Sequence, residues 1–275
     1  MQRFLFAVLF LLACSADAVA AGYDDFARGT TANNQHDSDM AITALTAALS
    51  AGDLNPNLQP TAHYERAIAY MRKERCDLAK ADADAALQAK PDYLNALLLR
   101  ADANACLVYS EAAIADYSAA LAQRDVAGAH FGRAIVLWQQ SRFKDAAVDL
   151  VEAAKLAPKY PYGAIWLAIA LPRADPSNVG AAKEALERVD DEDWPAPIVA
   201  LYRGKAKPAD VDAAASQGEA WTLPGQKCDA DFYIGEWQLL LGDKAAAKLR
   251  LSSAASSCTK SMGRAVAIFE RDHEQ

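Results

Sequence analysis

The sequence predicts an all-α protein built from consecutive antiparallel helix hairpins, and three observations lead to this fold class. An arginine-alanine pair begins at Arg66, Arg100 and Arg133, at intervals of 34 and 33 residues. Further alanines follow the alanine of each pair at the same distances of 12 and 19 residues. Two of the three units close on a proline, Pro91 or Pro158. A repeat of this period is typical of stacked helical hairpins.

Each unit is expected to contain two helices that meet through small residues. In the clearest copy we expect helices over about 62–73 and 77–89, because apolar residues recur there at helical spacing. Alanine at the three fixed positions lets antiparallel backbones approach closely, since a larger side chain would hold them apart. Proline just beyond the second helix ends it, because proline lacks the amide proton that a continuing helix donates.

This pattern resembles the tetratricopeptide repeat (TPR), which has small residues at repeat positions 8, 20 and 27 and proline at position 32. Ala67, Ala79, Ala86 and Pro91 hold those positions in one unit. The next unit departs from the pattern, with Asp125 in place of the proline. The resemblance implies a right-handed superhelix of antiparallel hairpins with a C-terminal capping helix.

The repeat and its interruptions divide the chain into four segments. They are a signal peptide (1–21), four TPR-like hairpins (22–158), a divergent helical hairpin and linker region (159–227), and a C-terminal hairpin with a capping helix (228–275). Pro172 and Pro176 are expected to form a turn in the divergent segment, and Pro224 with Gly225 is expected to end a helix. We expect the capping helix over 261–273 to cover the terminal face of the solenoid.

The amino terminus predicts export to the periplasm or secretion. Arg3 supplies a positive charge, an apolar run follows over 4–13, and small residues provide a cleavage site. Such a run is too short to span a bilayer comfortably, which takes about 20 apolar residues. The alternative is an outer-membrane-anchored lipoprotein, in which Cys14 is lipidated and the protein meets the membrane only through that lipid.

The four remaining cysteines form two pairs, each separated by 30 residues, and hairpin geometry predicts two disulfides. Cys228 is expected just before the first helix of the last hairpin and Cys258 at the end of its second helix, so the two lie close together. Cys76 and Cys106 fall at neighbouring ends of two antiparallel helices. Disulfides suit an oxidising compartment, in agreement with the leader. Free buried thiols and a metal site are the alternatives, although metal ligands normally come in closer pairs.

The second half of the chain resembles the NlpI family of bacterial envelope TPR lipoproteins. The likeness rests on the order of AIWL at 164–167, Trp194, IVALYRG at 198–204, FYIG at 232–235 and LGD at 241–243. The resemblance implies a scaffold that brings together peptidoglycan hydrolases and a periplasmic protease.

Stacked TPR hairpins curve, and the first helix of each hairpin lines the concave side. The positions expected to face this groove hold Phe26, Thr30, Asn33, Tyr64, Ile68, Met71, Leu98, Asp102, Phe131, Ile135 and Trp138. Apolar and aromatic side chains on such a face predict binding of an extended peptide or a partner helix. The alternative is that several of them pack under the C-terminal half or against a neighbouring helix.

Four arginines share one repeat position and form a ladder along the predicted solenoid: Arg28, Arg66, Arg100 and Arg133. One interpretation is a binding row for carboxylate-bearing partners, because guanidinium groups form bidentate pairs. The other is that their stems cover apolar surface while their charged ends reach acids such as Asp82 or Asp102.

We therefore predict a non-enzymatic scaffold or adaptor of the cell envelope that binds a protein or peptide partner. The residues form no recognisable catalytic, metal or cofactor motif. A net charge of -8 and a pI near 5.1 argue against nucleic-acid binding, which usually needs a basic surface. Two alternatives remain: a homo-oligomeric structural protein, such as a homodimer, or an auxiliary subunit of a polysaccharide-modifying system whose site lies in the loop-rich region 190–227.

Overall fold

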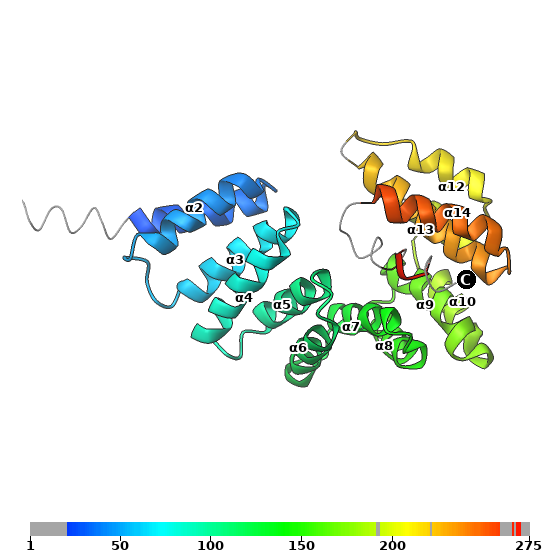
Figure 1. The fold of residues 1–275 in the computed structure, drawn as a ribbon, viewed down its shortest axis with the longest axis horizontal. Helices are drawn as coiled ribbons and strands as arrows, with labels where there is room; N and C mark the ends of the chain where they lie inside the picture. Colours follow the sequence, from blue (N-terminus) through cyan, green and yellow to red (C-terminus); the bar gives the residue numbers. More distant parts are fainter. Residues whose placement is uncertain (1–20, 191–192, 221, 259–265, 267, 271–275) are drawn as a thin grey trace, which may run out of the picture. The chain divides into compact units, whose positions relative to one another are not determined.

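A computed structural model describes residues 21–190, 193–220, 222–258, 266 and 268–270, and within them all regular structure is helical. The chain divides into two compact units with the boundary between Ala120 and Leu121. Figure 1 shows the helices of each unit following one another in chain order. The predicted signal peptide and Cys14 lie outside the described residues except for Ala21. Most of the predicted capping helix also lies outside them, while residues 266 and 268–270 are helical.

Unit 1 is a series of antiparallel hairpins. Its helices are a first helix over residues 21–34, α2 (Ser38–Ser50), α3 (Gln59–Arg72), α4 (Cys76–Ala89), α5 (Leu94–Cys106) and α6 (Ser110–Gln123), which ends just past the unit boundary. Helix α3 contacts α2, α4 and also α5. The first helices of two successive hairpins therefore lie side by side, as a TPR arrangement requires.

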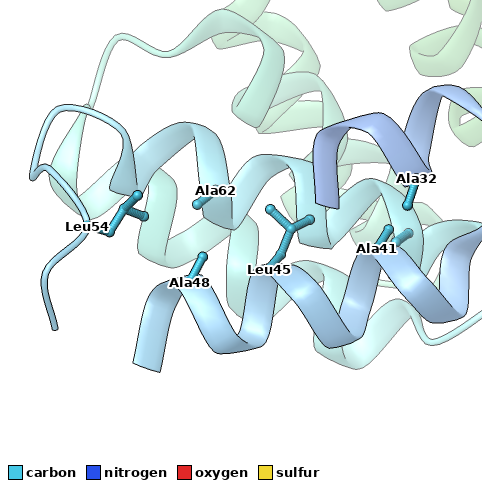
Figure 2. Close-up of a cluster of buried hydrophobic side chains, with 7 residues drawn as sticks. Ala32, Ala41, Leu45, Ala48, Leu54 and Ala62 are labelled. Carbon is cyan, nitrogen blue, oxygen red and sulfur yellow. The ribbon is translucent and has the colours of Figure 1, made fainter. Parts of the chain in front are cut away.

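Small residues hold the hairpins together, as predicted. The alanines at the three repeat positions of the clear units are at most 4 % exposed. In the first hairpin Gly29 takes the equivalent place, and a Cβ atom added there would lie 2.5 Å from the Leu45 side chain. Figure 2 shows the core beside it, which is made of Ala32, Ala41, Leu45, Ala48, Leu54, Ala62 and Ala69. A larger side chain at these positions would separate the helices.

The regular hairpins of both units turn through a residue with a positive φ, which stands at the same repeat position in each of them. These residues are His36, Glu74, Val108 and Ser141, with φ of 60°, 56°, 61° and 59°, and Gly242 with φ of 79°. At Val108 the backbone N–H donates to the Ala105 carbonyl at 3.0 Å, and the Tyr109 N–H donates to the Asn104 carbonyl at 2.8 Å. This pair of bonds is the Schellman motif, which satisfies the last carbonyls of a helix.

Unit 2 begins with a regular hairpin and continues into shorter, less regular helices. Its elements are α7 (Ala127–Gln139), α8 (Phe143–Leu156), α9 (Pro161–Ala174), the 3-10 helix η1 (Pro176–Asn178), α10 (Val179–Glu187), α11 (Ala196–Tyr202), α12 (Pro208–Ala215), α13 (Leu223–Leu240) and α14 (Lys244–Ser257). Helix α9 contacts α8, α10, α11 and α13 and so lies at the centre of the unit. None of the helices in the described ranges of either unit is long and apolar enough to cross a membrane.

Two local predictions in the divergent segment are wrong. Pro172 lies inside α9, which continues to Ala174, and only Pro176 takes part in the turn. Pro224 stands in the first turn of α13 rather than at a helix end, so Cys228 lies within α13 rather than before it. At Pro224 the reason is that proline is tolerated in the first turn of a helix, because N–H groups there form no hydrogen bond within the helix. At Pro172 the helix runs on for two more residues although one of its hydrogen bonds is lost.

Both predicted cysteine pairs are joined as disulfides in the structure. The Cα atoms are 6.2 Å apart for Cys76 and Cys106 and 5.2 Å apart for Cys228 and Cys258. These separations lie within the usual range for a disulfide. The first bridge links α4 to α5 in unit 1, and the second links α13 to the end of α14 in unit 2.

Candidate functional site

The first helices of unit 1 carry eight of the eleven predicted groove residues. We call this set the inner-helix face of unit 1; it consists of Phe26, Thr30, Asn33, Tyr64, Ile68, Met71, Leu98 and Asp102. Tyr64, Ile68, Met71 and Leu98 are half-buried, and Asp102 is exposed. Tyr64 and Leu98 pack against the buried cluster around Leu87 and Ala96, so each apolar side chain has one side on the core and another open to solvent.

The part of this face that comes from the first helix is mostly committed to packing within the unit. Phe26 packs against the core shown in Figure 2, and the Thr30 hydroxyl donates to the Ala27 carbonyl at 2.9 Å. Asn33 is only 3 % exposed. Its amide donates to the Glu65 carbonyl at 2.8 Å and to the Glu65 carboxylate at 2.7 Å. Asn33 therefore joins the first helix to α3 and is not available to a ligand.

Tyrosines and carboxylates surround the apolar centre of the inner-helix face. The rings of Tyr64 and Tyr93 lie 5.3 Å apart between centroids. Burial raises the pKa of Tyr64, and nearby Tyr93, Glu65 and Asp102 raise it further. Burial also raises the pKa of Tyr93, with a contribution from Glu65. Tyrosine hydroxyls are neutral near pH 7 even without these shifts, so both can donate hydrogen bonds.

Asp102 is the acidic edge of the same face. Its carboxylate accepts a hydrogen bond from the Tyr117 hydroxyl at 2.6 Å. Although the residue is accessible to solvent, the protein atoms around its carboxyl group raise its pKa to about 6, and the Tyr117 hydrogen bond only partly opposes this. Because the residue is exposed, its negative charge at pH 7 is open to a cationic group of a partner.

In unit 2 two of the three predicted groove residues belong to the core, which corrects the prediction for them. Ile135 is 1 % and Trp138 0 % exposed. The Trp138 ring meets Trp166 of α9 edge-on, with centroids 5.8 Å apart, and its Nε1 donates to Glu270 at 2.5 Å. The cause is that α9 and the C-terminal residues cover α7. Phe131 remains half-buried and packs on Tyr160 at 5.6 Å.

A buried ionic cluster that was not predicted stabilises this arrangement. Arg173 of α9 donates to Glu270 at 2.8 Å and to Glu236 of α13 at 3.2 Å, and its guanidinium lies 5.0 Å from the centre of the Trp138 ring. Glu236 is 0 % and Glu270 2 % exposed. Charged residues within otherwise apolar helices, as in FYIGEWQLL at 232–240, were the signal that could have revealed it.

The arginine ladder packs within the hairpins. Arg66, Arg100 and Arg133 each donate Nε and Nη2 to both carboxylate oxygens of an aspartate 16 residues further on, at 2.6–2.9 Å. These partners are Asp82, Asp116 and Asp149, so Asp82 was predicted correctly and Asp102 wrongly. Arg28 has no such partner and pairs with Asp25 instead. Bidentate pairing within the hairpin leaves these three arginines little capacity to bind a carboxylate ligand.

Two histidines reinforce the same aspartates. Nδ1 of His63 lies 2.8 Å from Asp82, and Nδ1 of His130 lies 2.8 Å from Asp149. In the last hairpin the charges are exchanged: Asp231 takes the histidine position and Arg250 the aspartate position, with 2.7 Å between them. Across the described ranges, histidine, cysteine and acidic side chains form no group of three or more suited to a metal ion.

The comparisons with known proteins agree with the helical-hairpin architecture. No family profile matches the chain. A solved tetratricopeptide repeat protein from Parabacteroides merdae is 16% identical, with 91% of this chain and 99% of that chain covered at a TM-score of 0.54. A solved MamA protein is 18% identical, with 61% and 91% covered at a TM-score of 0.54. MamA from Desulfovibrio magneticus is 15% identical, with 62% and 93% covered at a TM-score of 0.52.

These similarities define the class of protein: an all-α solenoid of helix hairpins. More particularly, the buried alanines, the repeated turns and the similar solved structures identify the fold as the TPR type. Identities this low establish the fold alone and not a more specific family.

Proposed function

We propose that the protein is a non-enzymatic scaffold that binds a partner polypeptide on the inner-helix face of unit 1. The observation that carries the proposal is the set of half-buried side chains of α3 and α5, namely Tyr64, Ile68, Met71 and Leu98. An apolar surface of this kind, presented by the first helices of a TPR-type array, suits a helix or an extended peptide. The groove residues of α7 belong to unit 2 and are not part of this proposal: Ile135 and Trp138 are buried, and Phe131 packs on Tyr160.

The charges on this face suggest the character of the partner. Asp102 is exposed beside Tyr64, Glu65 is half-buried, and the neighbouring arginines of the ladder already pair with Asp82 and Asp116. The accessible surface therefore combines apolar side chains with carboxylates. We infer a partner segment that carries both apolar and basic side chains. Opposite charges would speed the association of the two proteins and fix the alignment of the segment on the face.

The proposed location is the bacterial cell envelope. Its support is the leader predicted over residues 1–21 and the two disulfides, which persist in oxidising compartments. The resemblance of the second half to the NlpI family makes cell-wall hydrolases and a periplasmic protease the first partners to test. Lipidation of Cys14 remains an alternative for the anchored form, and mass spectrometry of the mature amino terminus separates the two cases.

Site-specific photo-crosslinking in intact cells tests the binding face directly. A crosslinking amino acid is placed at Ile68 or Leu98 and, as a matched control, at Ala81, which is exposed on the second helix α4. The proposal predicts the same crosslinked partner from the first two positions and none from Ala81. Equal crosslinking from all three positions, or from Ala81 alone, would refute the assignment of this face.

A second measurement separates a partner of another sequence from self-association. Ile68→Asp combined with Leu98→Asp should abolish partner recovery, whereas Ala81→Asp should not, and circular dichroism checks that each variant keeps its helices. If the product crosslinked through Ile68 proves to be a second copy of this chain, and light scattering shows a dimer that the double variant lacks, the homodimer replaces the scaffold as the function of this face.

A further inference from the structure

A pocket of about 360 Å³ lies within unit 2, between the divergent segment and the C-terminal half of α13. Helices α9, α10 and α13 and the end of α11 surround it. Its volume is near the lower end of the range for small-ligand sites, so it suits one large side chain rather than a long segment. It shares no residue with the inner-helix face of unit 1.

The interior of the pocket is largely apolar. Leu186, Trp237 and Leu240 line it. Val179 also lines it and keeps 45 % of its surface exposed, which is high for a large apolar side chain. Exposed apolar surface inside a concave site favours an apolar ligand group, because burying that surface releases free energy.

One residue that lines the pocket has a backbone carbonyl without its usual helical partner. Pro172 lies inside α9 and, like Ala168, lines the pocket. In an α-helix the N–H of residue 172 would donate to the carbonyl of residue 168, but proline has no N–H. The Ala168 carbonyl therefore receives no α-helical hydrogen bond from this position. A ligand that brings an N–H group could supply it.

Two lysines provide a positive charge at the same site. Lys183 of α10 and Lys205 after α11 line the pocket and are exposed. Neither side chain forms an ion pair or a hydrogen bond with any residue that the structure describes. Arg203 beside them is already engaged, because it donates to the carbonyls of Leu186 and Val189 at the end of α10. Glu187 is the one carboxylate among the lining residues, so the two lysines leave a positive excess.

We propose that this pocket binds the carboxyl-terminal residue of a partner polypeptide that ends in a large apolar side chain. The side chain contacts Leu186, Trp237 and Leu240, a backbone N–H donates to the Ala168 carbonyl, and the terminal carboxylate pairs with the two lysines. A fatty acid would satisfy the apolar wall and the lysines, but it has no N–H for Ala168. An internal peptide segment would lack the terminal carboxylate.

Fluorescence anisotropy with defined peptides tests the proposal on the full oxidised protein. The probe is a dye-labelled heptapeptide of glycine and serine that ends in leucine with a free carboxylate. The same peptide with a carboxyl-terminal amide, and one ending in serine, are the matched probes. We expect each change to weaken binding roughly tenfold, because each removes either the charge-assisted bonds or the buried side chain. Equal binding of the free and amidated peptides would overturn the proposal.

Variants assign the effect to the pocket. Lys183→Gln with Lys205→Gln should weaken the free-carboxylate peptide roughly tenfold and leave the amidated peptide unchanged. Lys144→Gln with Lys248→Gln makes the same change of net charge elsewhere in unit 2 and should leave binding within about twofold. An equal loss in the two double variants would mean that only net charge matters, and would contradict the site.

Two further variants and one further ligand distinguish this pocket from the inner-helix face and from a lipid site. Val179→Asp places a carboxylate at the first position of α10, where a helix accommodates negative charge, and should weaken the free-carboxylate peptide. The Ile68→Asp variant of unit 1 should bind the peptide as the wild type does. The proposal for this pocket and the proposal for the inner-helix face are therefore tested separately. Saturable binding of dodecanoate without binding of any peptide would overturn the peptide assignment in favour of a lipid ligand.

Discussion

Replacing Val108 by glycine should stabilise the protein, although it deletes an apolar side chain. Val108 has φ of 61° at the turn between α5 and α6, a conformation that disfavours residues with a Cβ atom and especially β-branched ones. Its side chain is 71 % exposed, so it contributes little buried surface. The substitution therefore removes backbone strain without opening a cavity.

The magnitude follows from two opposing terms. Left-handed helical backbone costs an L-amino acid about 1–2 kcal/mol, and glycine avoids that cost. Glycine in turn loses more conformational freedom on folding, which costs about 0.5–1 kcal/mol. The net gain expected for Val108→Gly is about 0.5–1 kcal/mol. For a unit of roughly 100 residues this corresponds to an increase in Tm of about 3–6 °C.

Urea unfolding followed by far-ultraviolet circular dichroism measures the change. The matched control is Val148→Gly, the same substitution at a side chain that is 64 % exposed in the interior of α8. There glycine should destabilise by a few tenths of a kcal/mol, because it is a weaker helix former than valine and helical backbone has no positive φ to relieve. If Val108→Gly lowers stability as Val148→Gly does, the assignment of strain to this turn is wrong.

Three further predictions concern the disulfide and two aspartates. Removing the bridge by Cys76→Ala with Cys106→Ala should cost about 3–4 kcal/mol of unfolding free energy under oxidising conditions, because the bridge closes a loop of 30 residues. Asp82→Asn should destabilise at pH 7, because the wild-type carboxylate accepts bonds from Arg66. Burial by itself would raise the pKa of Asp82, but hydrogen bonds from Arg66 and His63 lower it below 3.8. That contribution is present above the unfolded pKa and is lost as pH falls through the folded value, so the stability gap measured by urea titration should shrink below about pH 4. Asp102 has a pKa raised from 3.8 to about 6, so the wild type loses stability as pH rises from the unfolded value to the folded one. Asp102→Asn should therefore gain stability relative to wild type as pH rises from about 4 to about 6, and should keep that gain at pH 7.

Each of these outcomes has a control. Added reductant should destabilise unit 1 of the wild type but leave unit 1 of the double cysteine variant unaffected. A similar loss of unfolding free energy in unit 1 of both proteins would contradict the role of the bridge. A gap for Asp82→Asn that persists at pH 2 would mean that shape rather than charge matters. NMR titration measures the Asp102 carboxyl directly, and an ordinary value near 3.8 would refute the raised pKa.

The repeated part of the fold could be predicted because its causes are local. Ala67, Ala79 and Ala86 stand at fixed spacing, and their burial follows from the close approach that small side chains permit. The bridge between Cys76 and Cys106 followed from the same register. Pro172 and Pro224 were assigned wrongly because a proline marks a helix boundary without saying which side the helix occupies.

The sequence by itself determined the helix hairpins, their period and both cysteine pairs, because these depend on residues close along the chain or on the register of one repeat. Only the tertiary structure decided which predicted groove residues stay accessible. Trp138 carries the pattern of a groove residue, yet it is buried by a contact with Glu270, 132 residues away. The pocket likewise depends on Pro172, Lys183, Lys205 and Trp237, which come from separate elements of the least repetitive segment and its neighbour. Whether a side chain is buried depends on the segment that packs against it, and in these cases that segment lies far away along the chain.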